Sequence, residues 1–183
     1  MKRPVMNRPA VVIRLIALVV ALLMLSGCDE HYVHTSHTTV TTDPRPVLDN
    51  FHMVDSYETD TGLGRHYELG LNPYIWDGLF EVYWYASYVR DYYAEVWIND
   101  RPSLRGARFI DDFYCGDGLN CDSYGSTLCQ YTEDFFLSCT IDNPGVDIAD
   151  LVYTLPQAMY MIVQVCDTGS TYCEYQHREV WLE

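Results

Sequence analysis

Residues 79–89 read Leu-Phe-Glu-Val-Tyr-Trp-Tyr-Ala-Ser-Tyr-Val, and residues 92–99 read Tyr-Tyr-Ala-Glu-Val-Trp-Ile-Asn. In both stretches, apolar side chains alternate with polar or amphipathic ones, which is the period of a strand with one buried face. The alternation predicts a core face made of Phe80, Val82, Trp84, Ala86, Ala94, Val96 and Ile98. Two half-buried strands of this kind favour an all-β domain.

Further strands are expected between residue 65 and the C-terminus, separated by turn-forming residues such as Asn143-Pro144-Gly145. No stretch after the N-terminus has the period of an amphipathic helix. The remaining expected strands are 104–110, 127–131, 135–141, 158–166 and 172–182. About seven to nine short strands predict an antiparallel β-sandwich over residues 51–183, with immunoglobulin-like or Greek-key order. A β-barrel is the alternative.

Six cysteines lie in the second half of the chain: Cys115, Cys121, Cys129, Cys139, Cys166 and Cys173. An even number suits disulfide bonds in an exported domain, although six cysteines allow fifteen pairings. The local interpretation pairs consecutive cysteines, because positions on either side of a turn bring facing Cβ atoms close together. A zinc site is the alternative, but it usually needs a Cys-x-x-Cys spacing that is missing here.

The first 27 residues predict a signal peptide, with four basic residues followed by an apolar run over 15–25. That run is short for a membrane-spanning helix. It ends in Leu25-Ser26-Gly27-Cys28, which resembles the lipobox of bacterial lipoproteins. The resemblance implies that signal peptidase II cleaves before Cys28 and that this residue carries a diacylglyceryl group. Several acyl chains, such as palmitate, on one residue would give stable membrane anchoring.

The resemblance to a lipobox implies that the protein is anchored in the bacterial cell envelope. Asp29 resembles an inner-membrane retention signal, which favours the periplasmic face of the inner membrane over the outer membrane or the cell surface. Residues 28–50 are rich in Thr and His and poor in apolar residues, so they predict a flexible tether. His31, His34 and His37 in this tether could capture Zn²⁺ or Cu²⁺, with a plain solvated tether as the alternative.

The chain after the lipobox is strongly acidic. The whole sequence has 11 Lys and Arg against 26 Asp and Glu, a formal net charge of −15. Four basic residues precede Cys28 and every acidic residue follows it, so the mature chain would carry 7 − 26 = −19. Such a surface excludes nucleic-acid binding as a main role, because phosphate backbones need clustered Lys and Arg.

One acidic stretch contains Asp111, Asp112, Asp117, Asn120 and Asp122 among glycines. Hard oxygen ligands on a Gly-rich loop are the ligands that Ca²⁺ prefers. The spacing differs from that of an EF-hand loop, and a solvated acidic loop is the alternative. The sequence therefore predicts a domain without a cofactor, with bound Ca²⁺ as the alternative.

Motifs of catalysis are missing from the sequence. It has neither a Gly-x-Ser-x-Gly elbow nor a phosphate-binding Gly-rich loop. Outside the tether, His52, His66 and His177 are the histidines available to activate a nucleophile. We therefore expect a non-enzymatic domain, with an enzyme that uses an acidic site as the alternative.

The aromatic residues provide the best indication of function. Tyr83 and Tyr85 lie opposite the expected core face of residues 79–89, and Trp97 lies opposite that of residues 92–99. We expect the three to form one outward aromatic surface, unless a second layer covers them. Tyr and Trp combine a large contact area with a polar group, as in protein interfaces and sugar-binding platforms. The sequence thus predicts a domain that binds another envelope protein, with a carbohydrate-binding module as the alternative.

Overall fold

The computed structural model describes residues 45–59, 68–87, 90–116, 119, 121–140 and 143–183. The expected signal peptide, the lipidation site Cys28 and residues 28–44 of the expected tether lie outside these described residues. Among the described residues, no helix has the length and hydrophobicity needed to cross a membrane.

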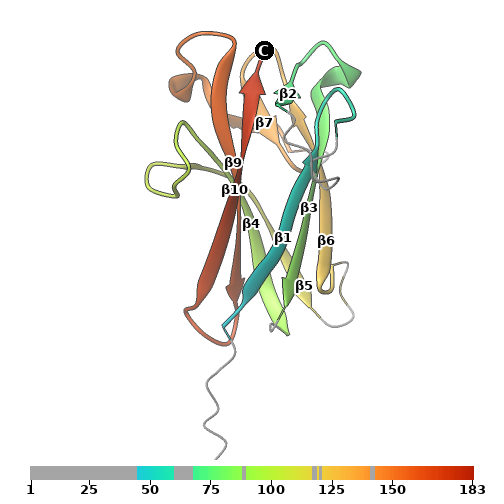
Figure 1. Ribbon diagram of the computed structural model, residues 1–183, viewed down its shortest axis with the longest axis vertical. Helices are drawn as coiled ribbons and strands as arrows, with labels where there is room; N and C mark the ends of the chain where they lie inside the picture. The colour runs from blue at the N-terminus through green and yellow to red at the C-terminus, as the bar shows by residue number, and fades with distance from the viewer. Residues whose placement is uncertain (1–44, 60–67, 88–89, 117–118, 120, 141–142) are drawn as a thin grey trace, which may run out of the picture. The chain divides into compact units, whose positions relative to one another are not determined.

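Ten strands of the described residues form two five-stranded sheets, which face each other as the two layers of a sandwich (Figure 1). Sheet A has the order β1-β3-β6-β7-β8 and sheet B the order β2-β10-β9-β4-β5. The strands are β1 (Val47–Val54), β2 (Leu69–Leu71), β3 (Leu79–Ser87), β4 (Asp91–Asn99), β5 (Arg108–Gly116), β6 (Tyr124–Tyr131), β7 (Phe136–Ser138), β8 (Val146–Asp147), β9 (Gln157–Asp167) and β10 (Cys173–Leu182). The predicted β-sandwich is confirmed. The strands beyond the expected ones are β1, which has eight residues, and the short strands β2 and β8.

Side chains from both sheets fill one hydrophobic core. All the residues that the alternation assigned to the core are buried: Phe80, Val82, Trp84 and Ala86 on β3, and Ala94, Val96 and Ile98 on β4. Full burial of a large apolar side chain contributes about 1.5–3 kcal/mol. These two strands therefore anchor the two layers to each other.

The chain passes from one sheet to the other after β1, β2, β3, β5 and β8. As a result β3 pairs with β6, and β4 pairs with β9, so neighbours in a sheet are often distant in sequence, as in Greek-key order. Strand β2 pairs with β10 in parallel, while the other pairs are antiparallel. Strand β1 begins at Val47, so it includes the last residues of the expected tether.

Strand β5 starts later than the expected strand over 104–110, and that expectation is wrong. The reason is the buried side chain of Asn99 at the end of β4, which is 1% exposed. Its Nδ2 donates to the carbonyl oxygens of Ser103 (2.5 Å) and Arg105 (3.3 Å). These bonds hold the segment after β4 as a loop, so the new strand begins only at Arg108.

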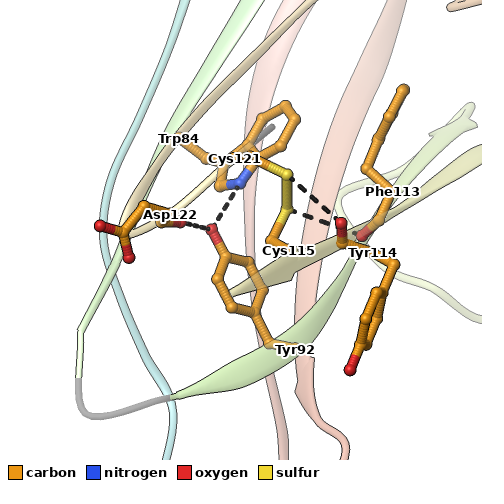
Figure 2. The surroundings of a disulfide bond; sticks show 7 residues. All are labelled: Trp84, Tyr92, Phe113, Tyr114, Cys115, Cys121 and Asp122. Carbon is orange, nitrogen blue, oxygen red and sulfur yellow. Dashed lines mark hydrogen bonds between the residues drawn. A yellow bond between two sulfur atoms is a disulfide. The ribbon is translucent and has the colours of Figure 1, made fainter. Parts of the chain in front are cut away.

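The three disulfides join consecutive cysteines, as predicted: Cys115–Cys121, Cys129–Cys139 and Cys166–Cys173. No thiolate among the six is left for a zinc site. In the last pair, the two cysteines face each other in the register of β9 and β10, with their Cα atoms 4.1 Å apart. Figure 2 shows the first pair beside the side chains of Trp84 and Tyr92.

Candidate functional site

The predicted aromatic surface is divided between the two faces of the sandwich. Tyr83 and Tyr85 lie on β3 in sheet A, whereas Trp97 lies on β4 in sheet B. Because both sheets turn their inner faces to one core, their outer faces point away from each other. The expectation of one shared surface is therefore wrong. Alternation along a strand separates inward from outward residues, but it does not identify the sheet that a strand joins.

On sheet B, Trp97 is half-buried among its neighbours. Its ring meets Phe109 of β5 edge-on, with ring centroids 5.1 Å apart, and its Nε1 donates to the carboxylate of Glu95 (3.2 Å). Ile162, directly across from Trp97 on β9, is 0% exposed although it lies on the outer face. Trp97 therefore belongs to a small packed cluster on that face.

On sheet A, Tyr83 and Tyr85 line a groove of about 290 Å³ on the outer face. Tyr83 stacks on His52 of β1, with ring centroids 4.7 Å apart and planes within 5°. Tyr85 stacks on Tyr124 of β6, with centroids 4.4 Å apart and an angle of 28°. Tyr124 is 76% exposed, so one of its ring faces is open to a ligand. We call these four residues the aromatic groove.

The register of the sheet fixes the aromatic groove. His52 is directly opposite Tyr83, and Tyr85 is directly opposite Tyr124. Cross-strand neighbours of this kind hold each other's side chains in place. The Tyr83 hydroxyl also donates to the carboxylate of Glu81. The rings are therefore ordered before any ligand arrives.

Polar groups lie beside the rings. Asn50 and Ser126 line the same groove, and the Asn50 amide lies 3.5 Å from Nδ1 of His52. Trp84 and Gly125 also line it, between the two stacked pairs. A site of this composition can stack on a flat ligand, attract a cation to a ring face, and form a few hydrogen bonds.

The sequence patterns do not identify His52 and Tyr124 as binding residues. His52 was considered only as a base for catalysis, and Tyr124 precedes the expected strand 127–131. The structure extends that strand to Tyr124. Both residues join the groove through cross-strand register, which local periodicity does not reveal.

The residues of the calcium hypothesis are dispersed where the structure describes them. Asp111 and Asp112 lie on β5, and Asp111 accepts a hydrogen bond from the hydroxyl of Thr140. Asp122 follows the first disulfide, while Asp117 and Asn120 lie outside the described residues. Within the described ranges, no group of three or more His, Cys, Asp or Glu could hold a metal ion. The hypothesis therefore depends on Asp117 and Asn120.

A larger cavity of about 540 Å³ is lined by the segment that follows β1, by β2 and by the end of the C-terminal strand. Its buried carboxylate, Asp55, accepts hydrogen bonds from the backbone N–H groups of Tyr57 (2.9 Å), Thr59 (2.7 Å) and Gly70 (2.9 Å). The Tyr57 hydroxyl donates to the carboxylate of Glu183, and this bond raises the pKa of Tyr57. Asp55 thus fixes the backbone of Tyr57, Thr59 and Gly70 beside this cavity.

Comparison of the chain with protein-family models, with curated proteins and with solved structures found no match.

Proposed function

We propose that this protein is an envelope lipoprotein whose sandwich domain binds another envelope protein through the outer face of sheet A, without catalysing a reaction. The lipobox-like sequence at Cys28 supports the anchor, and the composition of residues 28–46, which precede β1, supports a tether. The observation that carries the binding role is the aromatic groove, two stacked pairs on a hydrogen-bonded sheet. Aromatic side chains held in this way lose little conformational freedom on binding, and they are enriched among the residues that dominate interfaces.

Carbohydrate binding is the second candidate, and the volume and lining residues of the groove favour it. A volume of about 290 Å³ is near the lower end of small-ligand sites. Asn50 and Ser126 offer an amide and a hydroxyl beside exposed tyrosine rings, which suits a sugar ring that stacks and hydrogen-bonds. Trp97 has no part in this site because it lies on the other sheet.

Cross-linking followed by affinity capture from the protein's own envelope tests the proposal, with two matched double variants. Tyr85→Ala with Tyr124→Ala removes one stacked pair from sheet A. Tyr93→Ala with Tyr114→Ala removes an equivalent pair from sheet B, whose ring centroids lie 5.1 Å apart. We expect the sheet A variant to lose affinity for the captured protein by about thirtyfold, and the sheet B variant to keep it.

Equal capture by the wild type and both variants, or a loss confined to the sheet B variant, would overturn the assignment of the binding face. Release of the captured material by soluble envelope oligosaccharides, with direct binding of those sugars to the purified domain, would favour the carbohydrate candidate.

The anchor has a separate test. We expect Cys28→Ser to accumulate as an unprocessed precursor without the acyl mass, detected by mass spectrometry of the membrane fraction. Normal processing of this variant at another position would contradict lipidation at Cys28.

A further inference from the structure

Trp76 is presented to solvent by the turn η2 (Trp76–Gly78), which directly precedes β3. Its side chain is 67% exposed. Its φ is 49°, in the left-handed region that bulky residues rarely adopt, and Asp77 (56°) and Gly78 (72°) continue this conformation. An exposed indole recovers little of that cost through burial. Strained backbone of this kind is concentrated at binding sites, so the position of Trp76 indicates a role outside folding.

The backbone of this turn is fixed against β6. A Cβ atom on Gly78 would lie 1.9 Å from the carbonyl oxygen of Tyr131, so the position requires glycine. The side chain of Gln130 donates to the carbonyl oxygen of Asp77 (2.9 Å). The turn therefore presents Trp76 from a rigid support, which lowers the entropic cost of binding.

Apolar side chains continue from this turn along the outer face of sheet A. Leu79 and Leu128 are 36% and 40% exposed, and they line a second groove of about 270 Å³. The aromatic groove follows along the same strands. With a rise of about 3.3 Å per residue, the distance along β3 from Leu79 to Tyr85 is about 20 Å. The face thus has the length of a short extended peptide.

The strands of sheet A, the turn η2 and the hairpin between β6 and β7, all within the described residues, carry acidic side chains and no Lys or Arg. The acidic residues of these elements are Asp49, Asp77, Glu81, Glu133, Asp134 and Asp147. The ion pairs Arg101–Asp100 and Arg108–Asp150 involve none of them.

We infer that the partner contributes a basic segment, with Arg or Lys among apolar residues, that lies along the outer face of sheet A with Trp76 as its anchor at one end. Carboxylates attract the cationic side chains, and the exposed rings of Trp76 and Tyr124 bind them through cation–π contacts. The inference rests on the proposed function, because it specifies the chemistry of the protein bound at that face.

The test uses a fluorescent synthetic peptide of Arg and Leu, and the same peptide with Glu in place of each Arg, measured by fluorescence anisotropy at physiological salt. Asp77→Asn with Glu81→Gln removes one charge from the turn η2 and one from β3 of sheet A. Glu95→Gln with Asp112→Asn removes two charges from sheet B and serves as the matched control. We expect the basic peptide alone to bind. The double variant at Asp77 and Glu81 and the single variant Trp76→Ala should each weaken binding of the basic peptide by about tenfold. The control double variant at Glu95 and Asp112 should weaken it by less than about twofold.

Equal weakening by the two charge-matched pairs would show general attraction to an acidic protein and would overturn the inference. No effect of Trp76→Ala in a variant with an unchanged melting temperature, or no binding of the basic peptide, would also overturn it. If any of these outcomes is found but affinity capture still depends on Tyr85 and Tyr124, the proposed function stands and only the basic segment is excluded. Loss of that dependence would remove the proposed function itself.

Discussion

Trp84 donates its indole proton to the hydroxyl of Tyr92 across 3.2 Å, so a hydrogen bond inside the core joins β3 of sheet A to β4 of sheet B (Figure 2). Tyr92 in turn donates to the carbonyl oxygen of Asp122 (2.7 Å). Burial raises the pKa of the Tyr92 hydroxyl. The inner side of β3 is thereby held to the second sheet, while its outer side carries the aromatic groove.

We expect Tyr92→Phe to lower the free energy of unfolding by about 1–3 kcal/mol, because the change leaves the Trp84 Nε1 proton and the Asp122 carbonyl without their partner. Chemical denaturation measures this loss. Tyr93→Phe on the outer side of the same strand is the control, since Tyr93 is 42% exposed, and it should change stability by less than about 0.5 kcal/mol. Equal effects of the two substitutions would argue against a structural role for the hydrogen bond.

Gly125→Ala should destabilise the domain by about 1–3 kcal/mol, the usual cost of overpacking. Gly125 lies opposite Trp84 in the sheet, and a Cβ atom there would lie 2.1 Å from Cε2 of the indole. The same change at Gly169 is the control, because its nearest neighbouring atom would be 3.6 Å from the new Cβ. Thermal melts of both variants measure this loss of stability. An unchanged melting temperature for Gly125→Ala would contradict the close packing of Trp84.

All six cysteines after Cys28 should be oxidised, and non-reducing peptide mapping should link the peptides that carry Cys166 and Cys173. Replacing both by Ser should cost about 2 kcal/mol, the entropic contribution of a short closed loop. A link from either residue to a cysteine between 115 and 139 would contradict the observed pairing.

The domain should lose stability in alkali through Tyr131. Burial raises the pKa of Tyr131 to about 12 from its ordinary value of 10.0. The folded state therefore holds this proton more tightly, so its contribution is complete below pH 10.0 and is lost as pH rises toward 12. The slope for one group is about 1.4 kcal/mol per pH unit. Unfolding free energies measured across this range should fall less steeply for Tyr131→Phe, and identical slopes would contradict the assignment.

The sequence predicts the core of this domain because alternation is a local property. Every apolar position of β3 and β4 that the period assigned inward is buried, from Phe80 to Ile98. The consecutive disulfides follow in the same way, since each closes over a nearby turn. The boundaries of strands are less predictable from the sequence. The start of β5, for example, depends on hydrogen bonds from the buried side chain of Asn99 to the preceding loop.

The candidate site could be predicted only in part. Tyr83 and Tyr85 were identified, but Trp97 lies on the opposite face because pairing between distant strands decides which sheet each strand joins. Tyr124 enters the site through its register with Tyr85, and Trp76 stands on a turn outside any alternating stretch. Neither position has a local signal of periodicity.

Site-specific photo-cross-linking in the native envelope tests the binding face most directly. The photoreactive residue benzoylphenylalanine replaces Tyr124 on sheet A in one variant and Tyr114 on sheet B in another, where the native side chains are 76% and 49% exposed. We predict that irradiation joins a second envelope protein to position 124 and none to position 114. An adduct at position 114 alone, or no adduct at either position, would contradict the assignment of sheet A as the binding face.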